Sequence, residues 1–549
     1  PSGRERLRLA KLLSFWAVLL LGIAMPMQAG AQTPLPRFES GGEHPALLVD
    51  GEPFLILGAQ VNNSSNYPAM LDEVWPTLER MGANTVLMPV AWEQVEPVEG
   101  QFDFSFVDVL LDQVRSRDMR VVLLWYGTWK NTGPSYVPAW VKRDTQRFAR
   151  MRKADGSAHL VLSPHGEATM QADARAFSML MRHLKQVDPQ HTVVMVQVEN
   201  ESGSWGLDRD RSPEANALFA GPIPQELAEG LGIERRSWSD AFGPRAAQFF
   251  NSWYVARYVD TVAAAGQAQK DLPMFVNAAL GNAFTDEGGD VGPSGGPNWN
   301  ALPIWRIAAP NIPAYGPDIY NRDPKAVEAY LDRYAAHGPL MVPEIGNAAE
   351  YARFIWPAMG RGAVLFAPFG IDGTRYSNYP LGAKELDEDT LEAFAAPYRL
   401  FGQMPREWAR IAREHPLWGT AKGEDGADQT HIMGQWKLTA QYARWAFAED
   451  DWTWIERDAH PLADVPTGGL VVAQLSDDVF LVGGRNVKLR IALAQPGAGQ
   501  QGEVIEAQEG RFVDGEWVMR RRWNGDQIDW GFNFGAEPVW LRIEMDVLE

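Results

Sequence analysis

Thr192-Val-Val-Met-Val-Gln-Val-Glu199-Asn-Glu201-Ser-Gly203 is the stretch that decides the predicted fold. A short run rich in β-branched residues that ends in acids and a glycine is typical of a buried parallel strand. A second apolar run, Pro339-Leu-Met-Val-Pro-Glu344, also ends on an acid. In a barrel of parallel strands the chemistry lies at the C-terminal strand ends. The two runs therefore predict Glu201 and Glu344 at the same mouth of a barrel.

Strand and helix signals alternate over residues 40–390 and predict an α/β fold, a (β/α)8 TIM barrel. A small hairpin with its turn at Asp50-Gly51 precedes the first barrel strand. The expected strands cover residues 54–59, 83–91, 119–126, 192–198, 274–278, 314–320, 339–344 and 362–368. The expected helices cover residues 72–81, 106–117, 172–187, 241–264, 324–336 and 349–359.

The pattern of residues changes after the barrel region. A helical connector is expected at 391–418, and short alternating segments punctuated by glycine follow over 419–549. Leu470–Leu475, Val487–Leu493 and Trp517–Trp523 are examples of these segments. Their spacing predicts a C-terminal all-β sandwich domain. No residue pattern in this domain indicates catalysis.

Composition excludes several classes of function. The formal net charge of −20 over 549 residues argues against a nucleic acid partner, because such binding depends on Lys and Arg neutralising phosphates. A neutral polysaccharide remains compatible with this charge. The absence of cysteine excludes disulfides, thiolate metal sites and a cysteine nucleophile. The 9 histidines form no His-Glu-x-x-His motif, so no metal and no cofactor are predicted.

Residues 1–31 have the pattern of a secretory signal peptide. Four basic residues precede an apolar run from Leu12 to about Met25, and Ala29-Gly30-Ala31 follows. This order predicts cleavage after Ala31 and a periplasmic or secreted protein. A membrane anchor is the alternative, but the run is shorter than the ~20 residues that a span needs. No membrane span is expected after the signal is removed.

Four motifs occur together in this chain: Val196-Gln-Val-Glu-Asn-Glu201, Trp92-Glu-Gln-Val-Glu-Pro97, the opening run Leu48–Gly58 and Pro343-Glu344. Together they resemble glycoside hydrolase family 35, especially its secreted bacterial β-galactosidases with a C-terminal β domain. The similarity extends over nearly all of the chain after the signal peptide. The resemblance implies a retaining β-galactosidase with Glu201 as general acid/base and Glu344 as nucleophile.

The chain departs from the family at two strand ends. Trp125-Tyr-Gly-Thr-Trp-Lys-Asn131 replaces the Cys-Ala-Glu or Asn-Ala-Glu that grips galactose in many members, and Thr128 stands where their glutamate does. Trp92-Glu93 replaces the usual Trp-Asn. The axial 4-hydroxyl distinguishes galactose from glucose, so we expect Asn62 or Glu93 to bind it instead.

The chemistry of two carboxyls agrees with these roles. In a retaining mechanism they lie ~5–5.5 Å apart, one protonated and one ionised. The charge on Glu344 is expected to raise the pKa of Glu201, and esterification of Glu344 would remove that effect. Asn200 is expected to bind the sugar 2-hydroxyl, and Tyr320 to hold the Glu344 carboxylate in line.

Further sugar-binding candidates lie after other strands, and each has a structural alternative. Asn62, Glu93 and Asn277 are candidate hydroxyl ligands, although a rim carboxylate also orients loops. Trp129, Trp205 and Trp299 are candidate stacking residues, but many of the 22 tryptophans must belong to the core. Glu199 is expected to be structural, because it lies deeper in its strand. For Glu201 and Glu344 the alternative is a simple rim salt bridge.

Three functions remain open at this point. The first is an exo-acting β-galactosidase on plant cell wall oligo- or polysaccharides such as xyloglucan, a substrate suggested by the resemblance. The second is an endo-acting clan A glycanase, a mannanase or glucanase, with the same carboxyl pair in an open groove. The third is a catalytically silent carbohydrate-binding barrel. Loops 131–139 and 202–224 are expected to close a pocket, which favours exo action. The sequence leaves the oligomeric state open.

Overall fold

The computed structural model describes residues 33–285, 293–445 and 459–548. The predicted signal peptide, residues 1–31, lies outside the described residues. Within the described ranges, no helix combines the length and the apolar character that crossing a membrane requires.

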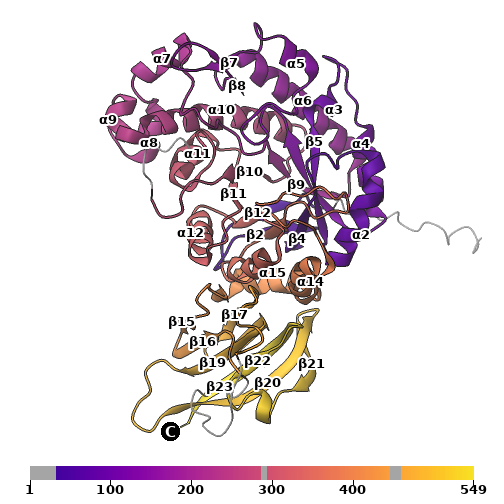
Figure 1. Cartoon of the computed structure of the whole chain (residues 1–549), viewed down its shortest axis with the longest axis vertical. Helices are drawn as coiled ribbons and strands as arrows, with labels where there is room; N and C mark the ends of the chain where they lie inside the picture. The colour runs from indigo at the N-terminus through magenta and orange to yellow at the C-terminus, as the bar shows by residue number, and fades with distance from the viewer. Residues whose placement is uncertain (1–32, 286–292, 446–458, 549) are drawn as a thin grey trace, which may run out of the picture. The chain divides into compact units, whose positions relative to one another are not determined.

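Eight parallel strands close into a barrel, as predicted (Figure 1). Neighbouring strands follow chain order around the barrel, and β13 pairs with β4 through Leu365 and Ile56 to close it. The strands are β4 (Ile56–Gln60), β5 (Thr85–Ala91), β6 (Arg120–Tyr126), β9 (Val193–Val198), β10 (Met274–Ala279), β11 (Ala314–Ile319), β12 (Met341–Ile345) and β13 (Leu365–Pro368). Their C-terminal ends form one mouth, where catalytic groups of such barrels lie.

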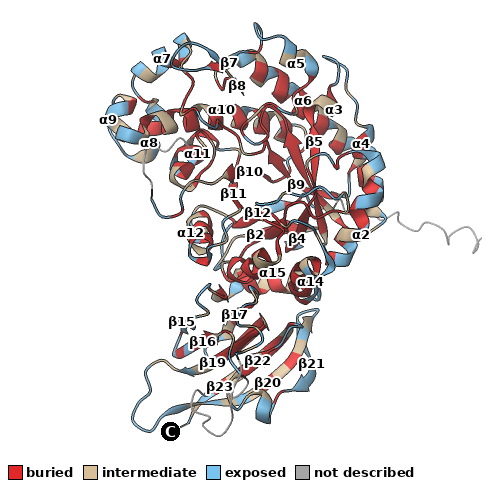
Figure 2. Ribbon diagram, viewed as in Figure 1, coloured by how far each residue is buried: buried red, intermediate tan, exposed pale blue. Residues whose placement is uncertain are grey.

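Helices flank the strands because each has one apolar face. In α2 (Leu71–Met81), Leu71, Val74, Trp75 and Leu78 are buried at helical spacing, and Gly82 ends the helix with φ of 80°. Figure 2 shows the buried strands inside a ring of helices with exposed outer faces. The other helices that follow barrel strands are α3 (Trp92–Val95), α4 (Ser105–Arg115), α6 (Glu167–Val187), α10 (Ala246–Gln267), α11 (Leu302–Ala308), α12 (Pro324–Ala335), η4 (Ala349–Phe354) and α13 (Ile355–Met359).

Two connections at the mouth of the barrel carry extra elements that the sequence did not predict. Between β6 and α6 lie the short helix α5 (Ala139–Arg143) and the hairpin of β7 (Arg150–Arg152) and β8 (Ala158–Leu162). Between β9 and α10 lie α7 (Pro213–Ala220), α8 (Gln225–Leu231) and α9 (Trp238–Phe242). Each is too short for hydrophobic periodicity to reveal. The predicted helical connector is two helices, α14 (Glu388–Gly402) and α15 (Pro405–Glu414).

The C-terminal region is a β-sandwich, as predicted. One sheet has the order β14-β17-β18-β23-β20-β21 and the other β15-β16-β19-β22. A shared core that includes Trp436, Phe480 and Leu541 lies between them. The strands are β14 (Leu417–Ala421), β15 (Gln429–Met433), β16 (Trp436–Gln441), β17 (Gly469–Ser476), β18 (Val479–Arg485), β19 (Val487–Leu493), β20 (Gln501–Val513), β21 (Glu516–Arg522), β22 (Phe532–Phe534) and β23 (Val539–Leu548). At the N-terminus, β1 (Arg37–Glu39), β2 (Ala46–Val49) and β3 (Glu52–Pro53) form a small sheet.

An aromatic cluster joins the sandwich to the helices that precede it. Trp540 of β23 stacks on Trp408 at 5.2 Å between ring centroids and meets Phe401 edge-on at 5.3 Å. Its indole N–H donates to the Leu400 carbonyl at 3.1 Å. Because Trp540 is fully buried in the same core as the barrel helices, the sandwich covers apolar surface of the helical region.

We predict that Trp540→Ala lowers the free energy of unfolding by about 3–5 kcal/mol, the usual cost of truncating a buried tryptophan. Urea unfolding followed by tryptophan fluorescence measures this. Val518→Ala, at a side chain 51% exposed on β21, is the control and should change the value by less than about 0.5 kcal/mol. Equal stability of the two variants would mean that the sandwich is an independent appendage.

Candidate active site

A cavity of about 490 Å³ opens at the C-terminal mouth of the barrel. This volume lies within the range typical of sites for small ligands, about 300–1,000 Å³. Its lining combines carboxylates, amides and aromatic rings. The lining residues are Asn63, Lys130, Asn131, Thr132, Glu201, Trp205, Ala279, Leu280, Asp318, Tyr320, Asn321, Tyr330, Glu344, Phe369, Tyr376, Asn378 and Leu381.

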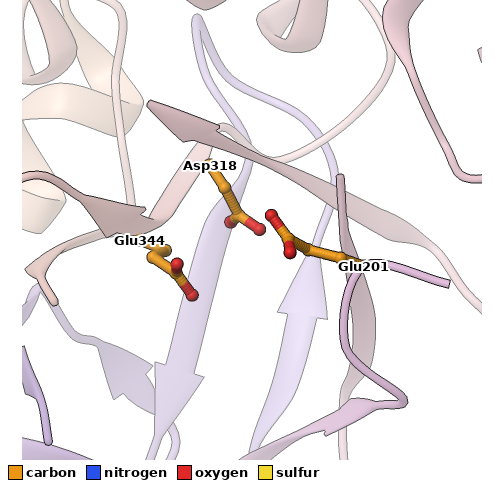
Figure 3. Close-up of side chains that lie close together, drawn as sticks. All are labelled: Glu201, Asp318 and Glu344. Atoms are coloured by element: carbon orange, nitrogen blue, oxygen red, sulfur yellow. The ribbon is translucent and has the colours of Figure 1, made fainter. Parts of the chain in front are cut away.

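Three carboxyl groups converge in this cavity (Figure 3). Glu201 follows β9, Asp318 is in β11 and Glu344 is in β12. Each contributes an oxygen that lies within 4.8 Å of those of the other two. Strand register explains part of this arrangement, because Asp318 and Glu344 are direct partners in the ladder between β11 and β12. The barrel thus brings Glu201 to Asp318 and Glu344, which lie more than a hundred positions further along the chain.

Both carboxylate oxygens of Glu344 accept hydrogen bonds. Gln60, at the end of β4, donates from Nε2 to Oε2 at 2.9 Å, and the Tyr320 hydroxyl donates to Oε1. Two donors and no acceptor suit an ionised carboxylate. The pKa of the Tyr320 phenol is raised well above its ordinary value by burial and by the nearby charge of Glu344, so this hydroxyl keeps its proton. The geometry therefore holds an anion at Glu344.

The surroundings of Glu201 favour its protonated form. Burial and the charge on Glu344 raise the pKa of Glu201 to about 7, while the Lys130 ammonium and contact with Asp318 act in the opposite direction. A carboxyl with a pKa near neutrality is suited to general acid and base catalysis. The site therefore combines a carboxyl that accepts two hydrogen bonds with a carboxyl whose pKa is raised to about 7.

Lys130 orients the amide of Asn200. Its Nζ, 4% exposed, donates to Asn200 Oδ1 at 2.9 Å. With the oxygen engaged in this way, Asn200 Nδ2 is buried and has no partner among the described residues. This amide does not line the cavity itself, but it adjoins Glu201 in the chain. An unengaged donor at this position fits the prediction that Asn200 binds a sugar hydroxyl.

A second carboxyl pair supports the wall behind the cavity. The pKa of Glu199 is raised well above its ordinary value by burial and by Asp173, and burial also raises the pKa of Asp173. Glu199 accepts from the Trp129 amide at 2.7 Å, and Asp173 accepts from Trp125 Nε1 at 2.9 Å. The first bond ties the residue after β9 to the loop after β6, and the second ties α6 to β6. The structure thus gives Glu199 the structural surroundings that the sequence analysis expected.

Backbone strain accompanies this arrangement. Glu199 and Glu201 have φ values of 66° and 44°, in the left-handed region that residues with a Cβ rarely adopt. Such residues cost about 1–3 kcal/mol and cluster at functional sites. Here the left-handed turns send Glu199 to Asp173 and Glu201 into the cavity.

Besides Asn200, four predicted substrate-binding side chains do not line the cavity. Asn62 donates from its backbone and its Nδ2 to Asp372 at 2.7 and 2.9 Å. Glu93 of α3 pairs with Lys142 of α5 at 3.3 Å. Trp129 is 1% exposed. Asn277 accepts from the Glu201 amide at 2.9 Å and donates to Asp318 at 2.7 Å. The structure thus replaces the expected contacts of Asn62, Glu93 and Trp129 with roles in packing and loop support, and Asn277 holds two other site residues.

The predicted stacking residues differ in their position relative to the cavity. Trp205 lines the cavity and is 58% exposed, so its ring is open to a ligand. Trp299 lies outside the lining, with Arg333 over its ring at 3.5 Å. Tyr376, which the sequence analysis did not single out, lines the same cavity and is 66% exposed.

Gln60, Lys130 and Asp318 were missed by the sequence analysis. Gln60 and Asp318 lie at the C-terminal ends of predicted strands, and this position could have marked them as candidate site residues. Lys130 lies in the loop after β6, where only tertiary contacts show that its ammonium reaches Asn200.

Comparisons with known proteins find matches for two parts of the chain. Residues 68–264 match the glycoside hydrolase 42 family model, described as beta-galactosidase, and residues 394–535 match a domain of unknown function, DUF5597. The first match includes Glu201 but not Glu344. A beta-galactosidase from Xanthomonas manihotis is 28% identical over 215 residues, 37% of this chain. The chain covers 33% of the length of that relative.

Solved structures show the same fold. A beta-galactosidase from Bacillus circulans sp. alkalophilus has a TM-score of 0.52 at 10% identity, over 89% of this chain and 99% of that chain. The cold-adapted beta-galactosidase from Rahnella sp. R3 has a TM-score of 0.47 at 13% identity, over 68% and 59% of the two chains. The family match and the Xanthomonas manihotis relative support a glycoside hydrolase family and do not single out family 35.

The raised pKa of Glu201 predicts a pH-dependent stability difference. Because the pKa rises from 4.5 to about 7 on folding, the folded protein binds this proton more tightly than the unfolded chain. Stability is therefore lost as the pH rises from 4.5 to about 7, by about 3 kcal/mol. We expect Glu201→Gln to be more stable than the wild type above pH 7 and to lose this advantage below pH 4.5.

Urea unfolding at both ends of this pH window measures the difference. Glu93→Gln is the control, because its side chain is 36% exposed, paired with Lys142 and outside the cavity lining. A constant difference between Glu201→Gln and the wild type at all pH values would contradict a raised pKa.

Proposed function

We propose that this chain is a retaining exo-β-galactosidase that removes terminal β-galactosyl residues from plant cell wall oligo- or polysaccharides, such as xyloglucan side chains. The observation that carries the proposal is the Glu201–Glu344 pair, with oxygens within 4.8 Å across one cavity. Retaining glycosidases hold their carboxyls about 5–5.5 Å apart, whereas inverting enzymes leave about 6.5–9.5 Å for a water molecule. The short separation supports double displacement.

The geometry supports a two-step mechanism. Glu344 attacks the anomeric carbon and forms a glycosyl ester, while Glu201 gives its proton to the leaving oxygen. Esterification removes the charge of Glu344, so the pKa of Glu201 falls. The Glu201 carboxylate then takes a proton from water, which attacks the same carbon and releases the sugar with retained configuration. Tyr320 and Gln60 hold the Glu344 carboxylate in position for attack.

The galactose preference rests on similarity. The family match over residues 68–264 and the Xanthomonas manihotis relative are both described as beta-galactosidase. Assignment to family 35 and the plant cell wall substrate rest on the motifs quoted above. Asn63, which lines the cavity and accepts from the Tyr126 hydroxyl at 3.1 Å, replaces Asn62 as the rim amide at the first strand.

Exo action is favoured over the alternatives by the lining of the cavity. Asn131 and Thr132 from one predicted loop and Trp205 from the other contribute to a single cavity with Glu201 and Glu344. An endo-acting mannanase or glucanase needs an open groove along the chain of its substrate. A silent carbohydrate-binding barrel has no need of a carboxyl with a pKa raised to about 7.

A periplasmic or secreted location is part of the proposal. It is supported by the pattern of residues 1–31, a basic flank followed by an apolar run and Ala29-Gly30-Ala31. Sequencing the N-terminus of protein recovered from the periplasm or medium tests it.

Substitution of the carboxyl pair gives the sharpest test of mechanism. We expect Glu344→Gln to reduce turnover of an activated aryl β-galactoside by about 10⁴-fold or more, with no product on addition of azide. Glu201→Ala should keep the first step on the same substrate, and azide should then yield a galactosyl azide of retained configuration. Product analysis by NMR distinguishes the two variants. Near wild-type rates in both would show that another pair performs the reaction.

A panel of aryl glycosides tests the sugar. Initial rates on p-nitrophenyl β-galactoside, glucoside, mannoside, xyloside and fucoside should favour the galactoside. A polar group left unpaired by the wrong epimer costs about 1–3 kcal/mol, which corresponds to about 5- to 150-fold discrimination per contact. Release of galactose alone from a galactosylated oligosaccharide indicates exo action. Equal or faster hydrolysis of the mannoside or glucoside would favour the endo-acting alternative.

A further inference from the structure

Asp318 is a third carboxyl in the cavity, and the two-step mechanism leaves it without a role. It is 3% exposed and lines the cavity with Glu201 and Glu344. A burial this deep is costly for a carboxylate unless a cation or several donors compensate. Among the described residues, no lysine or arginine forms an ion pair with Asp318 within 4.0 Å. The question is what keeps this group in the site.

The two carboxyl oxygens of Asp318 differ in their hydrogen bonding. Oδ2 accepts from Asn277 Nδ2 at 2.7 Å. Oδ1 is buried and has no donor among the described residues. Figure 3 shows the Asp318 and Glu201 carboxyls pointing toward one another, and their oxygens lie within 4.8 Å. Two ionised carboxylates do not persist in such an arrangement, since one of them takes up a proton.

We propose that Asp318 is a neutral carboxyl whose proton, on Oδ1, is donated in a hydrogen bond to Glu201, and that Asp318 is thereby a positioning residue for the general acid/base. Asn277 completes the arrangement. It accepts from the Glu201 amide through Oδ1 and donates to Asp318 through Nδ2, so one side chain fixes the backbone of Glu201 and the carboxyl of Asp318 together.

The groups around Asp318 favour its neutral form. Burial raises its pKa well above the ordinary value, and the charges of Glu344 and Glu201 add to this effect. The Lys130 ammonium opposes it. The remaining titratable groups that face Asp318 are phenols, Tyr126, Tyr320 and Tyr334, and burial raises the pKa of each, so they contribute no charge near neutral pH.

A donor at this position has a consequence for both chemical steps. One oxygen of Glu201 accepts from Asp318, which leaves the other oxygen to carry the proton for the leaving group. When Glu201 becomes ionised after the first step, the same hydrogen bond stabilises its carboxylate. The proton of Asp318 stays on Asp318 throughout, so the balance of the reaction is unchanged. The inference rests on the proposed function, because it assigns a role to Asp318 in that reaction.

Asp318→Asn and Asp318→Ala separate a neutral from an ionised Asp318. The amide of asparagine accepts from Asn277 and donates to Glu201, as a protonated carboxyl does. The substrate is whichever aryl or alkyl glycoside the wild type hydrolyses. On it we expect Asp318→Asn to keep kcat/KM within about threefold of the wild-type value. The alkaline limb of the kcat/KM profile, which reports the pKa of Glu201, should stay at the same pH. Asp318→Ala removes the donor, so the limb should move to higher pH by about one unit and kcat/KM should fall about tenfold or more when the leaving group is poor.

The opposite result identifies an ionised Asp318. In that case Asp318→Asn removes a negative charge beside Glu201, and the alkaline limb moves to lower pH, which overturns the proposal. A loss of kcat in both variants without movement of the limb indicates a merely structural role and also overturns it. Asp260→Asn is the matched control. Asp260 likewise accepts from an asparagine side chain, Asn311 at 3.0 Å, but lies on α10 outside the cavity lining, so the limb should stay in place.

A measurement without substrate separates this inference from the proposed function. The infrared absorption of protonated carboxyl groups at neutral pH should lose one band in Asp318→Asn relative to the wild type, and Asp260→Asn serves as the same control. Loss of the band in a protein that hydrolyses no glycoside would contradict the proposed function and leave the protonation of Asp318 supported. If Asp318→Asn retained the band while the wild type hydrolysed a glycoside, the inference about Asp318 would be overturned and the proposed function would stand.

Discussion

Electrostatic repulsion between carboxyls at the barrel mouth is the constraint on which the site depends. One oxygen each of Glu201, Asp318 and Glu344 lies within 4.8 Å of the others, and Lys130 supplies the cation among the lining residues. Because three adjacent negative charges are unfavourable, protonation differs between the groups. Hydrogen-bond partners decide which group stays ionised. Glu344 receives two donors, whereas Glu201 and Asp318 face one another, so the surroundings of the three carboxyls differ.

The rest of the fold keeps these groups from relaxing apart. Asp318 and Glu344 cannot separate without breaking the ladder between β11 and β12. Glu201 is held by Asn277, which accepts from its backbone amide, and by the left-handed backbone at Glu199 and Glu201. Hydrogen bonds of Glu199 and of its neighbour Asp173 offset the strain of this backbone. Far from the mouth, the sandwich covers apolar helical surface through Trp540. The stability that the sandwich contributes far from the mouth therefore helps to offset the backbone strain at the site.

The candidate site also shows how a departure from a family pattern is accommodated. Thr128 stands where the family 35 motif has a glutamate, and its hydroxyl donates to Asp173 at 2.7 Å, inside the wall rather than in the cavity. Lys130, two residues on, reaches the cavity instead and engages Asn200. The loop after β6 thus presents a cation where the family pattern has an acid. That exchange reduces the repulsion that a further carboxylate would add.

The sequence by itself determined the barrel, the sandwich and the meeting of Glu201 and Glu344 at one barrel mouth, because these depend on local signals. Valine-rich runs that end in acids predict parallel strands, and the strand end fixes which mouth Glu201 and Glu344 occupy. Only the tertiary structure decided the partners of each group. Asp318, Gln60 and Lys130 acquire their roles from strand register and from contacts between segments far apart in the chain. Asn62 and Glu93 also follow strands, yet Asp372 and Lys142 hold them away from the cavity lining. A strand end specifies a neighbourhood, whereas the direction of a side chain depends on the hydrogen bonds and charges that folding brings to it.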